Sequence, residues 1–272
     1  MSENNFFIGI DVGTETINLL VMNEEEILYT KTEVTEEGGL VASQRILEEA
    51  VRELNLPSGD TLPIVSTGAA KKTINFALKQ STDMVCHAKG AHWYFSDAGT
   101  VIDIGASGSR VMRLNNAGRV DKFAVNAKCA SGTGIYLRNM TKIIESSFEE
   151  MSDLSAGIEE GTEISNYCAV FAESEVISKI HAGEPKDRIA AGIFDAVVDR
   201  LMEQLRKVGT REEVIVTGGV ARNTGLVRSL EKRIGLKAKI PPDPEITGAL
   251  GAALIARGAF SSVKPGLGVD PK

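Results

Sequence analysis

A short turn near the start of the chain has residue types that suit phosphate. Asp11 and Gly13 close the apolar run of residues 6–12, and Thr14 follows them. In such a turn, backbone N–H groups and a threonine hydroxyl can bind phosphate, while the carboxylate holds a metal ion through water. Gly13 also lets the backbone approach a ligand closely. A single turn of this kind is more often an ordinary β-turn than a binding site.

A second Asp-x-Gly turn, at Asp103 and Gly105, ends another apolar run. Two such turns from two repeats can face each other across a cleft and hold a polyphosphate from both sides. A third glycine turn, Thr-Gly-Gly at residues 217–219, follows a buried-strand pattern and can admit a nucleoside. The three turns in this order predict a nucleotide-binding protein.

Two cysteines are the next candidates for chemistry. Cys129 lies shortly before a helical pattern that begins near Ile135, and Cys168 lies further along the chain. A thiolate is stabilised near a helix N-terminus, and iron–sulfur clusters need thiolate ligands. A two-fold dimer would supply four thiolates from two cysteines per chain. From spacing alone, burial of these cysteines as small apolar side chains is the favoured alternative.

Cys86 and His87 stand side by side in the sequence. We expect Cys86 to contribute to packing rather than to bind a metal. His87 has no metal-ligand residue three or four positions further on and no evident acidic partner. It is therefore also predicted to be structural.

The composition restricts the class of protein. The chain has 272 residues, of which 43% are hydrophobic and 25% are charged, as in globular proteins. No apolar run approaches the roughly 18–20 residues that cross a bilayer, and the first residues lack the basic start of a signal peptide. A net charge of −7 argues against a broad nucleic-acid surface. Three cysteines are too few for a disulfide scaffold, so we expect a cytoplasmic protein without membrane or nucleic-acid partners.

The elements that must position the turns form an internal repeat. Residues 6–29 read as three short strands in an antiparallel meander, with the first turn at Gly13. The same order of strand, Asp-x-Gly turn, strand, turn and strand returns in residues 100–125. The first copy is followed by an amphipathic helix at residues 40–54 and a strand at 62–66. The repeat predicts two domains of similar fold.

The second half of the chain has its own helices. Residues 214–217 read as a buried strand, flanked by helical patterns at about 186–207 and 223–234. A last helix, at about 247–259, has a face of glycine and alanine that would let another backbone pack closely.

Taken together, these motifs identify a family. The sequence resembles the BadF/BadG/BcrA/BcrD ATPases, which are the activators of 2-hydroxyacyl-CoA dehydratases and the ATPase subunits of benzoyl-CoA reductase. The resemblance covers nearly the whole chain, and its cysteine motifs are the most specific. The matching segments are 9–14 (GIDVGT), 86–91 (CHAKGA), 103–105 (DIG), 128–134 (KCASGTG), 168–177 (CAVFAESEVI), 217–223 (TGGVARN) and 248–254 (GALGAAL).

The resemblance implies a fold and a division into domains. It implies an α/β protein with two ribonuclease-H-like domains of the actin/hexokinase/Hsp70 superfamily around a nucleotide cleft. The first domain would be 1–98, with the C-terminal helix at about 247–272 packing back on it, and the second 99–246.

The resemblance also implies a function. In this family, ATP binding and hydrolysis gate the transfer of a low-potential electron from a [4Fe-4S] cluster to a partner enzyme. The cluster bridges two subunits, and the matching ligands here are Cys129 and Cys168. ATP or ADP and Mg²⁺ would bind in the cleft, with Asp11 and Asp103 as the catalytic aspartates. The residues expected at the nucleotide are Gly13, Thr14, Gly105, Gly132, Gly134, Gly218, Gly219, Asn223 and Glu173.

Two of these nucleotide residues have alternative interpretations. Asn223 is favoured as a helix cap, which can also line the adenosine pocket. Glu173 either contacts the ribose or the metal, or is a solvated or capping charge. The family also implies partners: a second copy or a paralogous ATPase subunit, an acyl-CoA dehydratase or reductase as electron acceptor, and a ferredoxin or flavodoxin as donor.

The chain departs from the activators at three places. Residues 106–108 read Ala-Ser-Gly where the family has Gly-Gln-Asp, which puts the rate of hydrolysis in question. Residues 69–71 read Ala-Ala-Lys in place of Tyr-Gly-Arg, and Asn18 replaces a lysine. The Asp-Ile-Gly-Ala segment is more similar to the shorter ATPase subunit of benzoyl-CoA reductase. Two alternatives therefore stay open: a regulatory or assembly module with a degenerate ATPase site, and a small-molecule kinase of the same superfamily.

Overall fold

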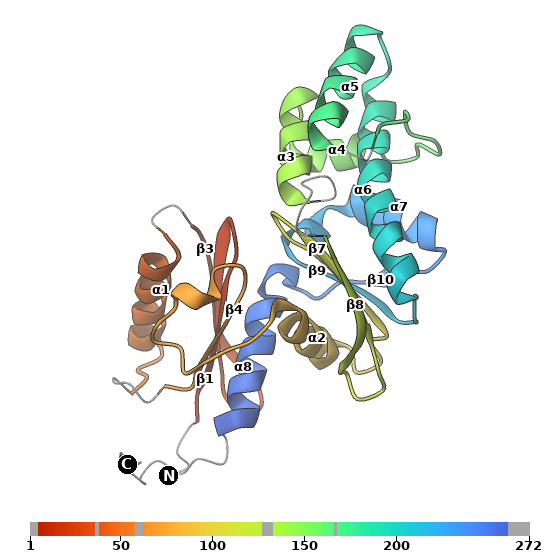
Figure 1. The fold of residues 1–272 in the computed structure, drawn as a ribbon. Helices are drawn as coiled ribbons and strands as arrows, with labels where there is room; N and C mark the ends of the chain where they lie inside the picture. Colours follow the sequence, from red (N-terminus) through yellow and green to blue (C-terminus); the bar gives the residue numbers. More distant parts are fainter. Residues whose placement is uncertain (1–4, 36–37, 58–61, 127–132, 166–167, 261–272) are drawn as a thin grey trace. The chain divides into compact units, whose positions relative to one another are not determined.

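The computed structural model describes residues 5–35, 38–57, 62–126, 133–165 and 168–260 (Figure 1). The chain forms two compact units. The first comprises residues 1–86 and 248–272, and the second comprises residues 87–247. The chain passes from the first unit to the second within a helix, α2 (Asp83–Tyr94).

The first unit is built on a five-stranded mixed sheet in the order β3-β2-β1-β4-β5. The first three strands form the predicted antiparallel meander, and β4 and β5 add in parallel to β1. Helix α1 packs its buried residues, among them Ile46 and Ala50, against this sheet. The elements are β1 (Phe7–Val12), β2 (Thr16–Met22), β3 (Ile27–Val34), α1 (Gly39–Glu53), β4 (Ile64–Thr67), a 3₁₀ turn (Lys71–Thr73), β5 (Lys79–Gln80) and, at the end of the chain, α8 (Thr247–Phe260).

The last helix explains why β1 is buried along its whole length. A side chain at Gly9 of β1 would overlap the backbone of α8, since its Cβ would lie 2.6 Å from the Ala253 nitrogen. Gly251 of α8 in turn lies against the backbone of Cys86. The small face predicted for this helix is therefore confirmed as a surface of close backbone packing. With both faces covered, β1 is a continuous apolar run rather than an alternating one.

The second unit repeats the strand order of the first. Its sheet runs β10-β9-β6-β7-β8, again with three antiparallel strands and two parallel additions. The predicted repeat is thus confirmed, and in both sheets the strand that ends in Asp-x-Gly is the central one. The strands are β6 (Thr100–Ile104), β7 (Ser109–Leu114), β8 (Val120–Asn126), β9 (Val214–Thr217) and β10 (Ala238–Lys239).

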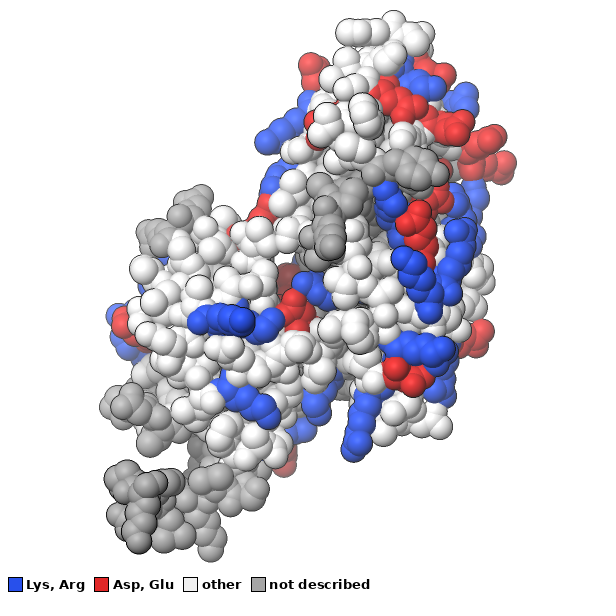
Figure 2. All heavy atoms as spheres, in the orientation of Figure 1, with Lys and Arg blue, Asp and Glu red and all other residues white. Residues whose placement is uncertain are grey.

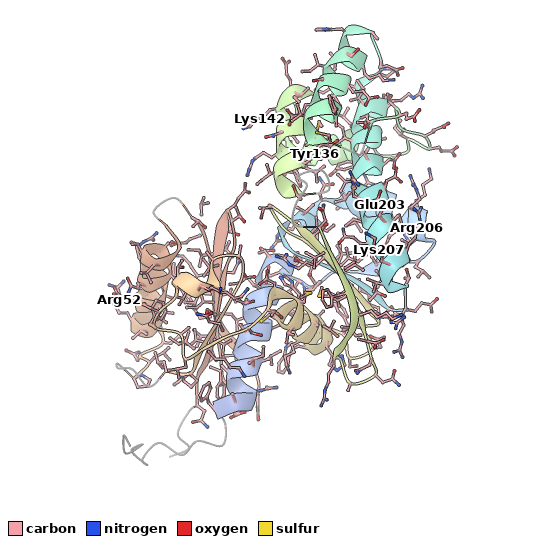
Figure 3. The ribbon with its side chains drawn as sticks, in the orientation of Figure 1. Arg52, Tyr136, Lys142, Glu203, Arg206 and Lys207 are labelled. Atoms are coloured by element: carbon pink, nitrogen blue, oxygen red, sulfur yellow. The ribbon has the colours of Figure 1, made fainter. Side chains whose placement is uncertain are left out.

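Helices cover the second sheet and extend beyond it (Figure 1). Helix α6 is buried along much of its length and packs on β7 and β8. Tyr136 of α3 is 1% exposed and belongs to the core that α3, α5, α6 and the sheet share (Figure 3). The helical elements are α3 (Gly134–Ile143), α4 (Phe148–Leu154), α5 (Ala169–His181), α6 (Lys186–Val208), α7 (Thr224–Ile234) and two 3₁₀ turns (Gly219–Arg222 and Pro244–Ile246).

The surface carries charges of both signs. On the face in view, acidic and basic side chains are interspersed over the helices of the second unit (Figure 2). Among the described residues, no helix is both long enough and apolar enough to cross a bilayer.

The packing of α8 makes a testable prediction about two of its glycines. Gly251→Ala places a methyl group onto the Cys86 backbone, where the Cβ would lie 2.6 Å from the Cys86 Cα. We expect the free energy of unfolding to fall by about 1–3 kcal/mol, as for other overpacked cores. Urea unfolding monitored by circular dichroism measures it.

Gly258→Ala is the matched control in the same helix. No described atom lies within 4 Å of its Cβ position, so alanine adds helix propensity without a clash. Equal effects of the two substitutions would contradict the packing described here.

Candidate nucleotide-binding site

The first Asp-x-Gly turn joins β1 to β2. Asp11, near the end of β1, is 8% exposed. The Gly13 N–H donates to the Thr16 carbonyl at 2.9 Å, and a Cβ on Gly13 would lie 2.8 Å from that oxygen. Glycine is therefore required by the tight turn itself. Thr14 is exposed at the tip of this turn.

A second turn packs directly against Asp11. Thr67 of β4 is paired with Asp11 in the sheet, and Gly68 follows with φ of +92°. A side chain at Gly68 would overlap both the Asp11 carboxylate and the Val12 carbonyl. Only glycine combines this left-handed backbone with such a close approach.

Two charged residues hold the Gly68 turn in place. Asp83 Oδ1 accepts hydrogen bonds from the Gly68 N–H and from Lys71 Nζ, both at 3.1 Å. Lys71 Nζ also donates to the Gly68 carbonyl at 3.1 Å. The Ala-Ala-Lys segment at residues 69–71 thus contributes a cation to this turn. Sequence reasoning missed Asp83, because no motif signals an aspartate that acts on a turn fifteen residues earlier.

The second unit builds the same arrangement. Asp103 of β6 is paired with Thr217 of β9, and Gly218 follows with φ of +85°. A Cβ on Gly218 would lie 2.6 Å from Asp103 Oδ1 and 2.5 Å from the Ile104 carbonyl. Each buried aspartate therefore has a threonine beside it and a left-handed glycine against its carboxylate.

Asp103 lies beside an arginine and a histidine. It is 2% exposed, and its Oδ2 accepts from Arg110 Nη1 at 2.7 Å. His87 Nε2 lies 3.6 Å from Asp103 Oδ1, and His87 Nδ1 lies 3.0 Å from the Thr217 hydroxyl. The expectation that His87 lacks an acidic partner is wrong. The two residues are distant in the sequence, and only the packing of α2 beside β6 brings them together.

The loop after Asp103 is tied to helix α3. Gly105 N–H donates to the Gly108 carbonyl at 2.9 Å, which closes the turn. The Gly134 N–H donates to the Gly105 carbonyl at 3.0 Å, and a Cβ on Gly134 would lie 3.3 Å from the Ala106 Cα. The absence of a side chain at Gly134 thus lets the start of α3 pack closely against the loop after Asp103. Gly132, also predicted at the nucleotide, lies outside the described residues.

The Thr-Gly-Gly turn leads into helix α7. No described atom lies within 4 Å of a Cβ on Gly219, so this side of the turn is open. Asn223 caps α7: its Oδ1 accepts from the Leu226 N–H at 2.8 Å, and its Nδ2 donates to the Phe148 carbonyl at 3.0 Å. The favoured prediction of a helix cap is confirmed.

Cys168 immediately precedes α5 and is half-buried at its N-cap. Its side chain makes no capping hydrogen bond, and the first turn of α5 has no acidic residue. The positive end of the helix dipole therefore favours negative charge at this sulfur. Cys129 lies outside the described residues.

Glu173 lies on the same helix, and its carboxylate bonds to a neighbouring helix. Its Oε1 accepts from Asn139 Nδ2 at 3.1 Å, which links α5 to α3. Glu175 accepts from the Ser165 N–H at 2.8 Å. Burial, together with these two carboxylates, raises the pKa of Tyr136.

The side chains at these positions can be compared with the ligands that Mg²⁺ and an iron–sulfur cluster require. Carboxylate and hydroxyl oxygens, such as those of Asp11 and Thr14, are the ligands that Mg²⁺ prefers. Cys168 offers a sulfur that is in no disulfide. Within the described part of the chain, no group of three or more His, Cys, Asp or Glu side chains is gathered to hold a metal ion.

The fold and the paired turns define the class. Two units with one strand order, each with an Asp-x-Gly strand at its centre, form the α/β fold of the actin/hexokinase/Hsp70 superfamily. A sugar kinase of this superfamily, a ROK glucokinase from Streptomyces griseus, matches with a TM-score of 0.57 at 14% identity, over 93% of this chain and 99% of that one. At this identity the likeness concerns the fold alone.

The family follows from closer relatives. The model of the BadF/BadG/BcrA/BcrD ATPase family matches residues 8–256, and the chain belongs to this family. It is 36% identical to the 2-hydroxyisocaproyl-CoA dehydratase activator of Clostridioides difficile, over 92% of this chain and 94% of that one. It is 32% identical to a benzoyl-CoA reductase subunit of Thauera aromatica, over 94% of both chains.

A solved structure extends the comparison. The activator of 2-hydroxyisocaproyl-CoA dehydratase from Clostridium difficile, with bound ADPNP, matches with a TM-score of 0.85. It is 33% identical to this chain, and the match covers 97% of this chain and all of that one.

The Asp103–Arg110 pair makes a prediction about stability. Arg110→Ala leaves a buried carboxylate without its main partner, so we expect the free energy of unfolding to fall by about 3 kcal/mol. Arg110→Lys keeps a cation and should lose less. Urea unfolding measures both. Adding Asp103→Asn to Arg110→Ala should recover part of the loss. Full stability of Arg110→Ala alone would show that the pair is not needed.

Cys86 makes a prediction about reactivity. It is fully buried, and burial raises the pKa of its thiol from 9.0 to about 11. Because only the thiolate reacts, iodoacetamide at pH 8 should label Cys168 far faster than Cys86 in the folded protein. Peptide mass spectrometry measures both rates. Labelling of Cys86 at the rate of Cys168 would contradict its burial.

The raised pKa of the Cys86 thiol also affects stability. The thiol favours the folded state below pH 9, and this contribution is lost as the pH rises toward 11.

Proposed function

We propose that this protein couples ATP to the transfer of low-potential electrons to an acyl-CoA dehydratase or reductase. Its family is one of ATPases, and two relatives are named as a dehydratase activator and a benzoyl-CoA reductase subunit. The observation that carries the proposal is Cys168, a half-buried thiol in no disulfide at the start of α5. A reducing cytoplasm suits such a thiol, and we propose that location.

The nucleotide would bind at the glycine turns. In this proposal Asp11 and Asp103 act at the phosphates and Mg²⁺, together with Gly13, Thr14 and Gly105. Residues 218–219 would bind the nucleoside, and the open side of Gly219 leaves room there. The relative that contains ADPNP supports this assignment. Gly132, Gly134, Asn223 and Glu173 would contribute through the backbone and by fixing the surrounding elements.

The electrons would come from a [4Fe-4S] cluster held by Cys129 and Cys168 of two subunits. The cluster supplies one-electron chemistry at a potential that N–H groups and solvent exposure tune. The chain holds its sulfur at the N-terminus of α5, where the helix dipole favours a thiolate. The second subunit is another copy or a paralogous ATPase subunit, and a ferredoxin or flavodoxin is the proposed donor.

One observation favours a second candidate, a regulatory or assembly module with a degenerate ATPase site. The carboxylate of the family's Gly-Gln-Asp segment is missing from residues 106–108. This candidate predicts nucleotide binding without measurable ATP hydrolysis, even with the acyl-CoA enzyme present. A small-molecule kinase shares only the fold and leaves Cys168 without a role.

Iron analysis tests the electron-transfer proposal. We expect about four irons and four acid-labile sulfides per dimer of anaerobically purified protein, with the mass in solution measured in parallel. Cys129→Ser and Cys168→Ser should each abolish the cluster and leave ADPNP binding intact. Their loss of iron follows from the need for four thiolates.

Cys86→Ser is the matched control, because the buried thiol of Cys86 lies in the core of the first unit. It should keep its iron. An iron-free wild type, both alone and after co-expression with a paralogous subunit, would overturn the proposal in favour of the regulatory candidate. Retention of full iron by Cys168→Ser would overturn the ligand assignment.

A further inference from the structure

His87 makes contacts that neither its sequence context nor the proposed function explains. It lies on α2 and is 5% exposed. Its two ring nitrogens face Thr217, which is fully buried, and Asp103, which is 2% exposed. A polar cluster this deeply buried is costly unless its members bond to one another.

The imidazole can satisfy both neighbours at once. A neutral histidine has one N–H donor and one acceptor nitrogen. With the Thr217 hydroxyl donating to Nδ1 at 3.0 Å, the proton on Nε2 points to Asp103 Oδ1 at 3.6 Å. That separation is longer than a hydrogen bond. Contacts of this kind often tighten only when a ligand binds.

These contacts join two turns of the site. Asp103 begins the Asp-x-Gly turn, and Thr217 begins the Thr-Gly-Gly turn. Gly218 of the second turn lies so near the Asp103 carboxylate that no side chain would fit between them. Arg110 holds the other oxygen of Asp103. Arg110 thus bonds to one oxygen of the carboxylate, and His87 lies beside the other.

The first unit has a counterpart to this contact. Thr67, the equivalent of Thr217, lies with its hydroxyl 3.5 Å from Asp83 Oδ1. Asp83 and His87 are four residues apart on α2, which places them one above the other on one helix face. One helix thus supplies the side chain beside the threonine of each repeat.

We propose that His87 is a positioning residue that fixes the Asp103 carboxylate toward Mg²⁺ and links it to the Thr-Gly-Gly turn. The inference rests on the proposed nucleotide function. It assigns to His87 no contact with the nucleotide, only the orientation of the group that acts at the phosphates.

The test measures how ADPNP binding by the full-length protein depends on Mg²⁺. We expect His87→Ala to raise the Mg²⁺ concentration at half-maximal binding about 10–100-fold, the usual effect of removing a residue that orients a metal-binding group. Binding of ADPNP without Mg²⁺ should change less than about threefold. Isothermal titration calorimetry measures both, and thermal unfolding checks the fold.

Conservative variants keep the test decisive if His87→Ala is unstable. His87→Gln retains an amide N–H that can reach Asp103, so it should recover much of the Mg²⁺ dependence. Thr217→Val removes the hydroxyl that orients the ring and should shift the Mg²⁺ midpoint in the same direction as His87→Ala.

His92→Ala is the matched control on the same helix. His92 packs against Gly118 in the β7–β8 turn, where a Cβ on Gly118 would lie 2.5 Å from the ring, and the variant should bind Mg²⁺ and ADPNP as the wild type does. A wild-type midpoint in folded His87→Ala, with normal ADPNP binding by the wild type, would overturn the role of His87 alone. No ADPNP binding by the wild type would overturn the proposed function and this inference together.

Discussion

The close approach of a left-handed glycine to a buried carboxylate shapes the turns of both units. It occurs twice, with Gly68 against Asp11 and Gly218 against Asp103. In each unit the contact requires two parallel strands to end at the same level, which the pairing of aspartate with threonine secures. In both sheets the aspartate strand lies at the centre, with the antiparallel strands on one side and the parallel strands on the other.

Burying the second carboxylate has an electrostatic cost that the first does not share to the same extent. Asp103 is 2% exposed and Asp11 is 8% exposed, and a charge in such a place must be paired or hydrogen-bonded. Arg110 provides the pairing from the neighbouring strand β7, in register with Asp103. His87, from helix α2, lies near the other oxygen of Asp103. The buried carboxylate is therefore surrounded by side chains from two different elements.

The small residues of α8 also produce close backbone contacts, here between a helix and its neighbours. Because Gly9 and Gly251 let backbones touch, the last helix covers β1 and meets α2 without intervening side chains. Such contacts leave little room for adjustment, since a backbone cannot change rotamer. A shift of α8 would therefore displace β1 and, with it, the turn that carries Asp11.

Much of this protein could be predicted from its sequence, because the relevant signals are local. Apolar runs ending in Asp-x-Gly, the alternation of turns and strands, and the glycine–alanine face of the last helix predicted the repeat, the meander and the close packing of α8. The family could be recognised from short motifs. Asn223 could be predicted as a cap because capping acts over three residues.

Which side chains meet depends on the packing of the whole chain. His87 and Asp103, Asp83 and Gly68, and Arg110 and Asp103 are joined by the packing of α2 and by strand register, neither of which leaves a pattern in the sequence. A hydrogen bond between distant residues depends on the three-dimensional path of the whole chain, whereas a turn or a helix face depends on a few neighbours. The elements and the family therefore follow from local signals in the sequence, whereas the partners of the buried charges follow from the fold.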